Sequence, residues 1–299
     1  WSFSEKLIIY LIGTTFLTHH ICIWMDTMDK RDKRKKRVFQ LGILLLLGTI
    51  LCLKYRNFFF GNVSKLAMVL HIDWSYQDQL IFLPIGISFY TLSAIGYMAD
   101  VYWGKVKAEY SLVKTALFLG FFPVIVEGPI CRWEDVEDTL FKNESVKAEN
   151  VFKGCYRIIW GLFKKMIIAD RLAVLVDKVY VGYESYSGAV IVVAAISYTI
   201  QLYMEFSGCM DMVIGSAGLF GIRLPENFSQ PFFAKTCTDF WKRWHITLGV
   251  WFKNYIFYPV SISKTARKWN KFTRKHFKGD FGKYVARMGI AAMALFPDQ

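Results

Sequence analysis

Residues Glu205–Tyr258 read EFSGCMDMVIGSAGLFGIRLPENFSQPFFAKTCTDFWKRWHITLGVWFKNYIFY, and this stretch decides how the chain is interpreted. Four carboxylates and one imidazole stand here among tryptophan, phenylalanine and glycine: Glu205, Asp211, Glu226, Asp239 and His245. An ionisable side chain close to hydrocarbon is costly unless it is paired or faces a hydrated cavity. Because such groups are concentrated here, we predict a functional site, and its histidine indicates proton chemistry.

The composition of the chain is typical of a membrane protein. Its 299 residues are 54% hydrophobic and 17% aromatic, and many of the charged residues, 20% of the total, are gathered in short runs. This distribution favours membrane spans separated by polar loops over a single soluble core.

The net charge of +13 raises the question of nucleic-acid binding. Seven of the eight residues Lys30–Arg37 are lysine or arginine, and this run directly flanks apolar segments. Short basic loops beside spans indicate a cytoplasmic location. We therefore predict the lipid bilayer as the partner of this chain, and no nucleic acid.

The six cysteines lie far apart, and none has the spacing of a metal site or of a disulfide framework. We predict no metal. The chain starts at Trp1 and stops at Gln299 inside an apolar segment, so we expect a fragment of a longer protein.

Apolar segments long enough to form spans recur along the sequence, since about 20 helical residues cross about 30 Å of hydrocarbon. The predicted spans are 5–25, 38–53, 79–102, 112–130, 151–180 (broken), 187–206, 209–222 (short) and 237–260, with another starting at 284–296. The predicted fold class is all-α, a polytopic transmembrane helical bundle with broken or re-entrant helices.

Loop charges predict the sides of the membrane. Lys30–Arg37 places the first loop in the cytoplasm, and Lys105 and Lys107 return to that side. The acidic loop 132–149 is then expected outside, and the basic run Lys264–Lys278 in the cytoplasm.

These sides constrain the segment 151–180. It has to enter and leave by one face if the loops on either side of it are to keep their predicted locations. We therefore predict a re-entrant pair with Lys164 and Lys165 at its tip.

Asp239–Tyr258 is predicted to form one helix with an aromatic face. Trp241, Trp244 and His245 share this face by their three- and four-residue spacing, and Arg243 lies off it. Two interpretations of His245 stay open. It is either a buried, hydrogen-bonded packing residue or a catalytic group that accepts a proton from a hydroxyl or holds a carbonyl oxygen.

Glu205 and Asp211 flank Gly208, which permits a tight reversal between two spans. These carboxylates either orient a histidine or bind a polar acceptor, or they cap helix ends at a turn. Glu226 and Asn227 lie in a predicted loop, where Glu226 either caps a helix or binds.

Glu127 precedes Gly128 and Pro129, at a break in a predicted span. Such breaks are tolerated where the freed backbone groups meet a neighbouring helix or a cavity. Glu127 is therefore either a residue of a pore or tunnel, or a charge at the membrane interface.

Three motifs in the opening stretch carry a resemblance. FSGCMDMVIG, PENFSQPF and DFWKRWHITLGVWFKNYIFYP resemble the signature block of the membrane-bound O-acyltransferase family. They are most similar to a bacterial branch with alginate O-acetylation proteins and the D-alanyl transfer protein of lipoteichoic acid. Upstream, PIGISFYTLSAIGYMADVYWG, FFPVIVEGPI and GLFKKMIIADRLA also resemble that branch, so the resemblance covers about residues 80–262.

The resemblance implies one multi-pass acyltransferase domain over 1–299, with a central tunnel and a signature core at 205–262. It implies transfer of an acetyl or D-alanyl group from a cytoplasmic thioester, either acetyl-CoA or the phosphopantetheine of an acyl carrier protein, with no bound cofactor. The acceptors are hydroxyls of an extracytoplasmic polysaccharide or teichoic acid. The implied location is the bacterial cytoplasmic membrane, with a carrier protein inside and an acyl-transfer partner protein outside.

The resemblance also implies roles for individual residues. His245 matches the histidine of the branch's Trp-(Arg/Lys)-Arg-Trp-His motif and is the expected catalytic residue. The expected residues of the tunnel and substrate site are Glu127, Glu205, Asp211, Glu226, Asn227, Trp241, Arg243 and Trp244.

The sequence departs from the family pattern at two points. Glu205 stands where the family has aspartate before Phe-Ser-Gly. A second family histidine, in a Trp-His-Gly context on the following span, has no match before Gln299. We expect it in the missing part of the protein, where it acts as general base while His245 orients or polarises.

Two other classes of function compete with this interpretation. A chain that truly ends at Gln299 is expected to be an inactive fragment or a scaffold. A transporter that uses Glu127, Glu205 and Asp211 as ion sites is the other alternative. Inverted internal repeats favour a transporter, and we find none in the sequence.

Overall fold

The computed structural model describes residues 8–29, 32–77, 83–142, 146–277 and 279–295. Some predicted features lie outside these ranges: Lys30 and Arg31 of the first basic run, residues 79–82 of the third span, Glu144, Lys278 and the chain end at Gln299. The described residues form helices and contain no strand, only one isolated bridge, which confirms the all-α class.

The chain divides into two compact units, Trp1–Pro225 and Glu226–Gln299, which we describe separately. The single acyltransferase domain stays a prediction, as does the central tunnel. Three helices of the described chain are long and apolar enough to cross a membrane: α1, α2 and α10.

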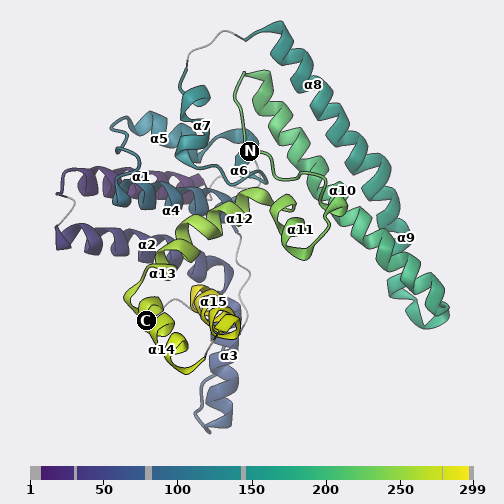
Figure 1. The fold of residues 1–299 in the computed structure, drawn as a ribbon. Helices are drawn as coiled ribbons and strands as arrows, with labels where there is room; N and C mark the ends of the chain where they lie inside the picture. The colour runs from purple at the N-terminus through teal and green to yellow at the C-terminus, as the bar shows by residue number, and fades with distance from the viewer. Residues whose placement is uncertain (1–7, 30–31, 78–82, 143–145, 278, 296–299) are drawn as a thin grey trace. The chain divides into compact units, whose positions relative to one another are not determined.

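The first unit begins with helices that pack on one another (Figure 1). They are α1 (Ile8–Asp26), α2 (Lys33–Lys54), α3 (Arg56–Val69) and α4 (Ile87–Trp103). Asp32 caps α2 by accepting a hydrogen bond from the Arg34 N–H at 2.7 Å. Met25 of α1 and Met98 of α4 are fully buried between these helices. The bounds of α1 and α2 confirm the first two predicted spans as helices.

The predicted span 112–130 is wrong, because this segment enters the unit and returns. It consists of α5 (Leu112–Leu119), α6 (Phe122–Ile125) and an extended stretch that leads to α7 (Trp133–Leu140). The eight residues of α5 span about 12 Å, too little to cross a membrane. Pro123 and Pro129 stop a longer helix from forming here.

Contacts with α4 trace the path of the segment 112–130. Before it, the Glu109 N–H donates to the Tyr97 hydroxyl near the C-terminal end of α4. At its far point, α6 approaches the start of α4 so closely that a Cβ on Gly86 would meet the Ile125 carbonyl oxygen at 1.6 Å. After it, the Trp133 ring stacks on Tyr97 at 4.7 Å, so the chain has come back to the end it left.

The return of the chain to this end corrects the predicted location of the acidic loop 132–149 relative to the basic loop between α4 and α5. Lys107 and Glu109 of the α4–α5 loop line one open pocket together with Glu137 and Asp138 of α7. The acidic segment therefore lies at the same end of the unit as the basic loop, and not at the opposite end as predicted.

A long helical pair completes the first unit. α8 (Ala148–Leu162) continues through a π-helical turn, η1 (Phe163–Ala169), into α9 (Asp170–Val181), and all three pack against α10 (Gly188–Leu219) (Figure 1). A short 3-10 turn, η2 (Tyr183–Ser185), precedes α10. The re-entrant pair predicted at 151–180 is wrong, because Lys164 and Lys165 lie inside this continuous helical segment.

The separate spans predicted at 187–206 and 209–222 are also wrong, since α10 runs through both. Gly208 makes no reversal. Its role is a close helix approach, because a Cβ there would lie 2.8 Å from the Gly161 carbonyl oxygen.

The second unit consists of short helices. They are η3 (Pro231–Phe233), α11 (Cys237–Arg243), α12 (Ile246–Phe252), the π-helical η4 (Lys253–Phe257), α13 (Tyr258–Ser261), α14 (Lys264–His276) and α15 (Gly279–Leu295). The single helix predicted over Asp239–Tyr258 is wrong, because the chain breaks at Trp244 and His245.

Candidate active site

His245 occupies the break between α11 and α12 in a left-handed conformation, with φ 47° and ψ 53°. A residue other than glycine rarely adopts this conformation unless the surrounding structure enforces it. Here the chain before α11 provides that support. The Ser229 N–H donates to the Arg243 carbonyl at 3.0 Å, and the Ile246 N–H donates to the Asn227 carbonyl at 2.9 Å. These two bonds clamp the turn from both sides.

Asn227 also holds the His245 ring. Its side chain is fully buried, and its Oδ1 accepts bonds from the Thr247 N–H at 3.1 Å and from the Thr247 hydroxyl at 2.6 Å. His245 Nδ1 lies 3.2 Å from the same oxygen. A backbone N–H is always a donor, so the Asn227 atom that faces it is the amide oxygen.

This contact fixes the tautomer of the histidine. Since Asn227 Oδ1 only accepts, Nδ1 of His245 carries the hydrogen and donates it. In a neutral imidazole the lone pair then lies on Nε2. His245 lies outside the three helices that can cross a membrane, and its burial lowers the pKa of its imidazole, which favours the neutral form. In this tautomer the neutral ring can accept a proton at Nε2.

The tryptophans of the signature differ in their surroundings. Trp244 belongs to an aromatic cluster, with ring centroids 5.1 Å from Phe228 and 5.6 Å from Phe240. Trp241 is 63% exposed, and its ring meets Phe240 edge-on. The break after Trp244 means that the predicted common helical face of Trp241, Trp244 and His245 does not form.

Arg243 forms an ion pair within α11. Its Nε lies 3.0 Å from Asp239 Oδ1, one helical turn earlier. This contact holds the pKa of the Asp239 carboxyl below its usual value. Asp239 also donates its backbone N–H to the Thr236 hydroxyl, which caps α11. The side chain of Arg243 thus stabilises the helix that leads into the turn.

In the first unit, Asp211 lies between two cations. Its carboxylate oxygens are 3.0 Å from Arg157 Nε and 2.7 Å from Lys164 Nζ. Glu205, nearer the middle of α10, lies 2.8 Å from Lys165 Nζ, which also binds Asp170 at 2.7 Å. The predicted helix-end carboxylates are therefore mid-helix residues in ion pairs. We call these six residues the α8–α10 ion cluster.

Glycines bring the two helices close enough for these pairs to form. A Cβ on Gly161 would lie 2.5 Å from the Gly208 carbonyl oxygen, and one on Gly154 would lie 2.8 Å from that of Gly215. Asp211 stands midway between the two α10 glycines. At these two glycine pairs the helices approach so closely that no side chain fits between the backbones. The charged side chains therefore lie between one glycine pair and the next.

Two predicted site residues remain. Glu127 is exposed just after α6, and its carboxylate interacts with the Cys209 side chain of α10, which lies between Glu205 and Asp211. Glu226 is exposed at the start of the second unit, next to Asn227. The structure thus brings His245 together with Asn227, and Asp211 with new cationic partners. Substrate contact by any of the predicted residues stays a prediction.

Four residues that matter here were missing from the predicted site: Thr247, Arg157, Lys164 and Lys165, the last two of which were predicted only as the tip of a re-entrant pair. A signal for the cations was present, because Arg157 and Lys164 are seven residues apart, like Gly154 and Gly161. Such a common period places all four on one helical face. Thr247 has no such signal.

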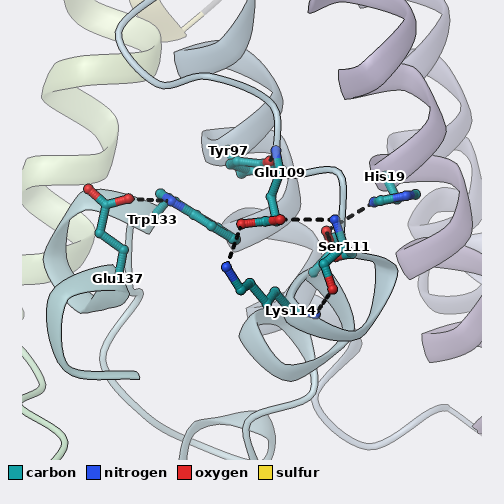
Figure 2. Close-up of polar contacts among 8 residues, drawn as sticks. His19, Tyr97, Glu109, Ser111, Lys114, Trp133 and Glu137 are labelled. Atoms are coloured by element: carbon teal, nitrogen blue, oxygen red, sulfur yellow. Dashed lines mark hydrogen bonds and ion pairs between the residues drawn. The ribbon is translucent and has the colours of Figure 1, made fainter. Parts of the chain in front are cut away.

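Figure 2 shows a second polar cluster, where the α4–α5 loop leads into α5. Glu109 accepts from the Ser111 N–H at 2.9 Å and from Lys114 at 3.3 Å, and Trp133 donates to Glu137 at 2.6 Å. His19 bonds to Thr115 of α5 at 3.1 Å. Of these bonds, the one between His19 and Thr115 fixes α5 to α1. Among the described residues, no group of three or more His, Cys, Asp or Glu side chains is placed to hold a metal ion.

Comparison with known proteins adds to this geometry. The sequence profile described as MBOAT, membrane-bound O-acyltransferase family, matches residues 105–274. This match contains the segment 112–130, the α8–α10 ion cluster and the His245 turn.

Three relatives illustrate the range of similar proteins. The probable alginate O-acetylase AlgI of Pseudomonas aeruginosa is 34% identical over 245 residues, which cover 82% of this chain and 46% of that protein. The peptidoglycan O-acetyltransferase of Helicobacter pylori is 32% identical, with 86% and 53% covered. The teichoic acid D-alanyltransferase of Bacillus subtilis is 30% identical, with 62% and 48% covered. The chain thus spans about half the length of the curated relatives it matches.

Proposed function

Because the chain belongs to the membrane-bound O-acyltransferase family, we propose that it carries part of the active site of an enzyme that acylates cell-surface hydroxyls. Its relatives are named for acetyl transfer to alginate or peptidoglycan and for D-alanyl transfer to teichoic acid. We propose an acetyl or D-alanyl group as the cargo, and a polysaccharide or teichoic acid outside the membrane as the acceptor.

The donor in this proposal is a cytoplasmic thioester, acetyl-CoA or an acyl group on the phosphopantetheine of a carrier protein. The enzyme spans the bacterial cytoplasmic membrane several times, and a partner protein outside receives or passes on the acyl group. Helices α1, α2 and α10, which are long and apolar enough to cross a membrane, support this arrangement.

The observation that carries the proposal is the bond from His245 Nδ1 to Asn227. A neutral ring with its hydrogen on Nδ1 has no hydrogen on Nε2, so it cannot donate to a carbonyl oxygen from that side. Of the two catalytic roles left open by the sequence, this geometry favours proton acceptance over polarisation of the carbonyl. The proposal therefore gives His245 the general-base role that the resemblance assigns to the second family histidine.

The proposed reaction is an ordinary acyl transfer. The acceptor hydroxyl gives its proton to Nε2 of His245 while its oxygen bonds to the thioester carbonyl carbon. The carbon–sulfur bond then breaks, and the leaving thiolate takes the proton back from the imidazolium. The products are an ester and a free thiol, and the histidine returns to its neutral form.

The test compares two histidine variants in the natural gene product. His245→Asn, which suits the left-handed backbone, is expected to lower the acylation of surface polymer by about 10²- to 10⁴-fold, the usual contribution of a general base. His276→Asn, at an exposed histidine of α14, serves as the control and should leave acylation unchanged. Mass spectrometry of base-labile esters on isolated polymer gives the readout. Full activity in His245→Asn would refute the proposed role.

A further inference from the structure

The positive charge of the chain is concentrated in its second unit. Residues 226–299 contain 13 lysines and arginines against four acidic residues. We propose that α14 binds the anionic headgroups of phospholipids through four lysines, Lys264, Lys268, Lys271 and Lys275, which we call the lysine stripe. This inference is independent of the proposed acyl transfer.

The lysine stripe follows from helix geometry. Its residues are spaced by four, three and four positions, so they share one face of α14, and all four are exposed. The opposite face is buried: Ala266 and Thr273 are fully covered. This small-residue face is the natural contact with α15, on which α14 packs (Figure 1).

The contact with α15 is close. A Cβ on Gly289 of α15 would lie 2.0 Å from the Trp269 indole nitrogen, so Trp269 packs directly on the α15 backbone. Trp269 lies on the same side of α14 as Ala266 and Thr273, at three- and four-residue spacing. The lysine stripe consequently points away from α15.

The charges on α14 repel one another. The helix contains no acidic residue, and the lysine stripe places like charges one turn apart, which disfavours the helix. Lys264 adds a cation to the first turn, where the helix dipole favours anions. A layer of phosphates along the stripe would relieve both effects.

An exposed aromatic side chain beside the stripe favours a membrane surface as the source of these phosphates. Phe272, one turn from Lys268 and Lys275, is 48% exposed. Lysines next to an exposed aromatic ring are typical of contact with anionic lipid. An acidic carrier protein is the competing partner, and the test separates the two.

The test uses the full chain in lipid nanodiscs of phosphatidylcholine, with or without 30% phosphatidylglycerol. Amine-labelling rates are measured at each lysine by mass spectrometry. Phosphatidylglycerol is expected to slow labelling of the lysine stripe about fivefold per lysine, the factor for a cation near an anionic surface. Lys235 and Lys242, exposed in the same unit, serve as references and should change less. Raising the salt concentration should remove the difference.

Two variants complete the test. Replacing the four lysines by glutamine should lower the number of phosphatidylglycerol molecules that remain bound in native mass spectrometry, whereas replacing them by arginine should preserve it. Equal labelling in both nanodiscs overturns the proposal. So does protection in neutral nanodiscs that appears only when an acidic acyl carrier protein is added.

Discussion

The His245 turn and the α8–α10 ion cluster both place polar groups in an apolar sequence, yet they suit different tasks. In the cluster, each carboxylate meets a cation: Asp211 binds Arg157 and Lys164, and Glu205 binds Lys165. In the turn, the neutral amide of Asn227 accepts a hydrogen bond from Nδ1 of the His245 ring, so the lone pair of the neutral ring lies on Nε2. Paired charges stabilise helix packing, while an oriented neutral imidazole can exchange a proton. The kind of partner, a counter-ion or a neutral amide, therefore distinguishes a polar residue that stabilises packing from one that can take part in proton transfer.

The largest effect on stability is expected at Asp211. Asp211→Ala leaves Arg157 and Lys164 facing each other without their anion, which should cost about 3 kcal/mol. Glu205→Ala is the matched control, because the Glu205 side chain is 44% exposed and its loss should cost at most about 1 kcal/mol. Thermal unfolding in detergent measures both. Equal losses of stability in the two variants would show that the ion pairs of Asp211 contribute no more than the exposed pair of Glu205.

The next effect concerns activity and the role of Asn227. Asn227→Ala removes the acceptor for His245 Nδ1 and should lower acylation on the order of 10²-fold. Asn227→Asp retains an acceptor and should recover most of the activity.

The pH profile of Asn227→Asp sharpens this prediction. The new carboxylate favours the charged imidazolium and raises the pKa of His245. Because the reaction needs the neutral ring, activity should fall off at a higher pH than in the natural protein as the solution is made more acidic. An unchanged profile would mean that Asn227 does not act through the ring.

A smaller effect is expected from the close helix approach. Gly161→Ala places a Cβ about 2.5 Å from the Gly208 carbonyl oxygen and should destabilise the helix pair by roughly 1–3 kcal/mol. Gly48→Ala, in α2, has open space around the new methyl group and should stabilise by up to about 1 kcal/mol. Opposite signs in thermal unfolding are the expected outcome. A stabilised Gly161→Ala would show that the helices are further apart.

The smallest stability effect is expected at Arg243. The pair with Asp239 is partly exposed and one turn apart, so Arg243→Ala should cost only about 0.5 kcal/mol. Activity makes this variant informative. If Arg243 binds substrate, as the sequence predicts, acylation falls much more than stability does. If it only supports α11, the two change together.

Much of the fold could be predicted from the sequence. Apolar runs identified α1 and α2, and the prolines and glycines around Glu127 correctly indicated an interruption of the helix, although the predicted span 112–130 does not form. The breaks were harder to interpret. A glycine inside an apolar run permits a reversal, but Gly208 serves close packing against Gly161, and only the partner helix distinguishes the two.

Charges inside apolar segments were misread for the same reason. Lys164 and Lys165 suggested a tip at the membrane interface, because their partners are 47 and 40 residues away in sequence. At the site, the motif resemblance identified His245, whereas its left-handed backbone and its bond to Asn227 depend on contacts across 18 residues. Sequence spacing indicates which face a residue occupies, but it does not give the partner that comes from elsewhere in the chain.

The π-helical turn η1 explains how two neighbouring lysines reach two different carboxylates of one helix. An α-helix turns successive side chains about 100° apart, so adjacent residues seldom serve the same neighbour. The wider turn of Phe163–Ala169 absorbs an extra residue without ending the helix. The π-helical turn therefore changes the direction of the side chains that follow it while the helical segment stays continuous. Shortening the chain there by one residue would rotate everything beyond it, and Lys165 and Asp170 would no longer be aligned with Glu205.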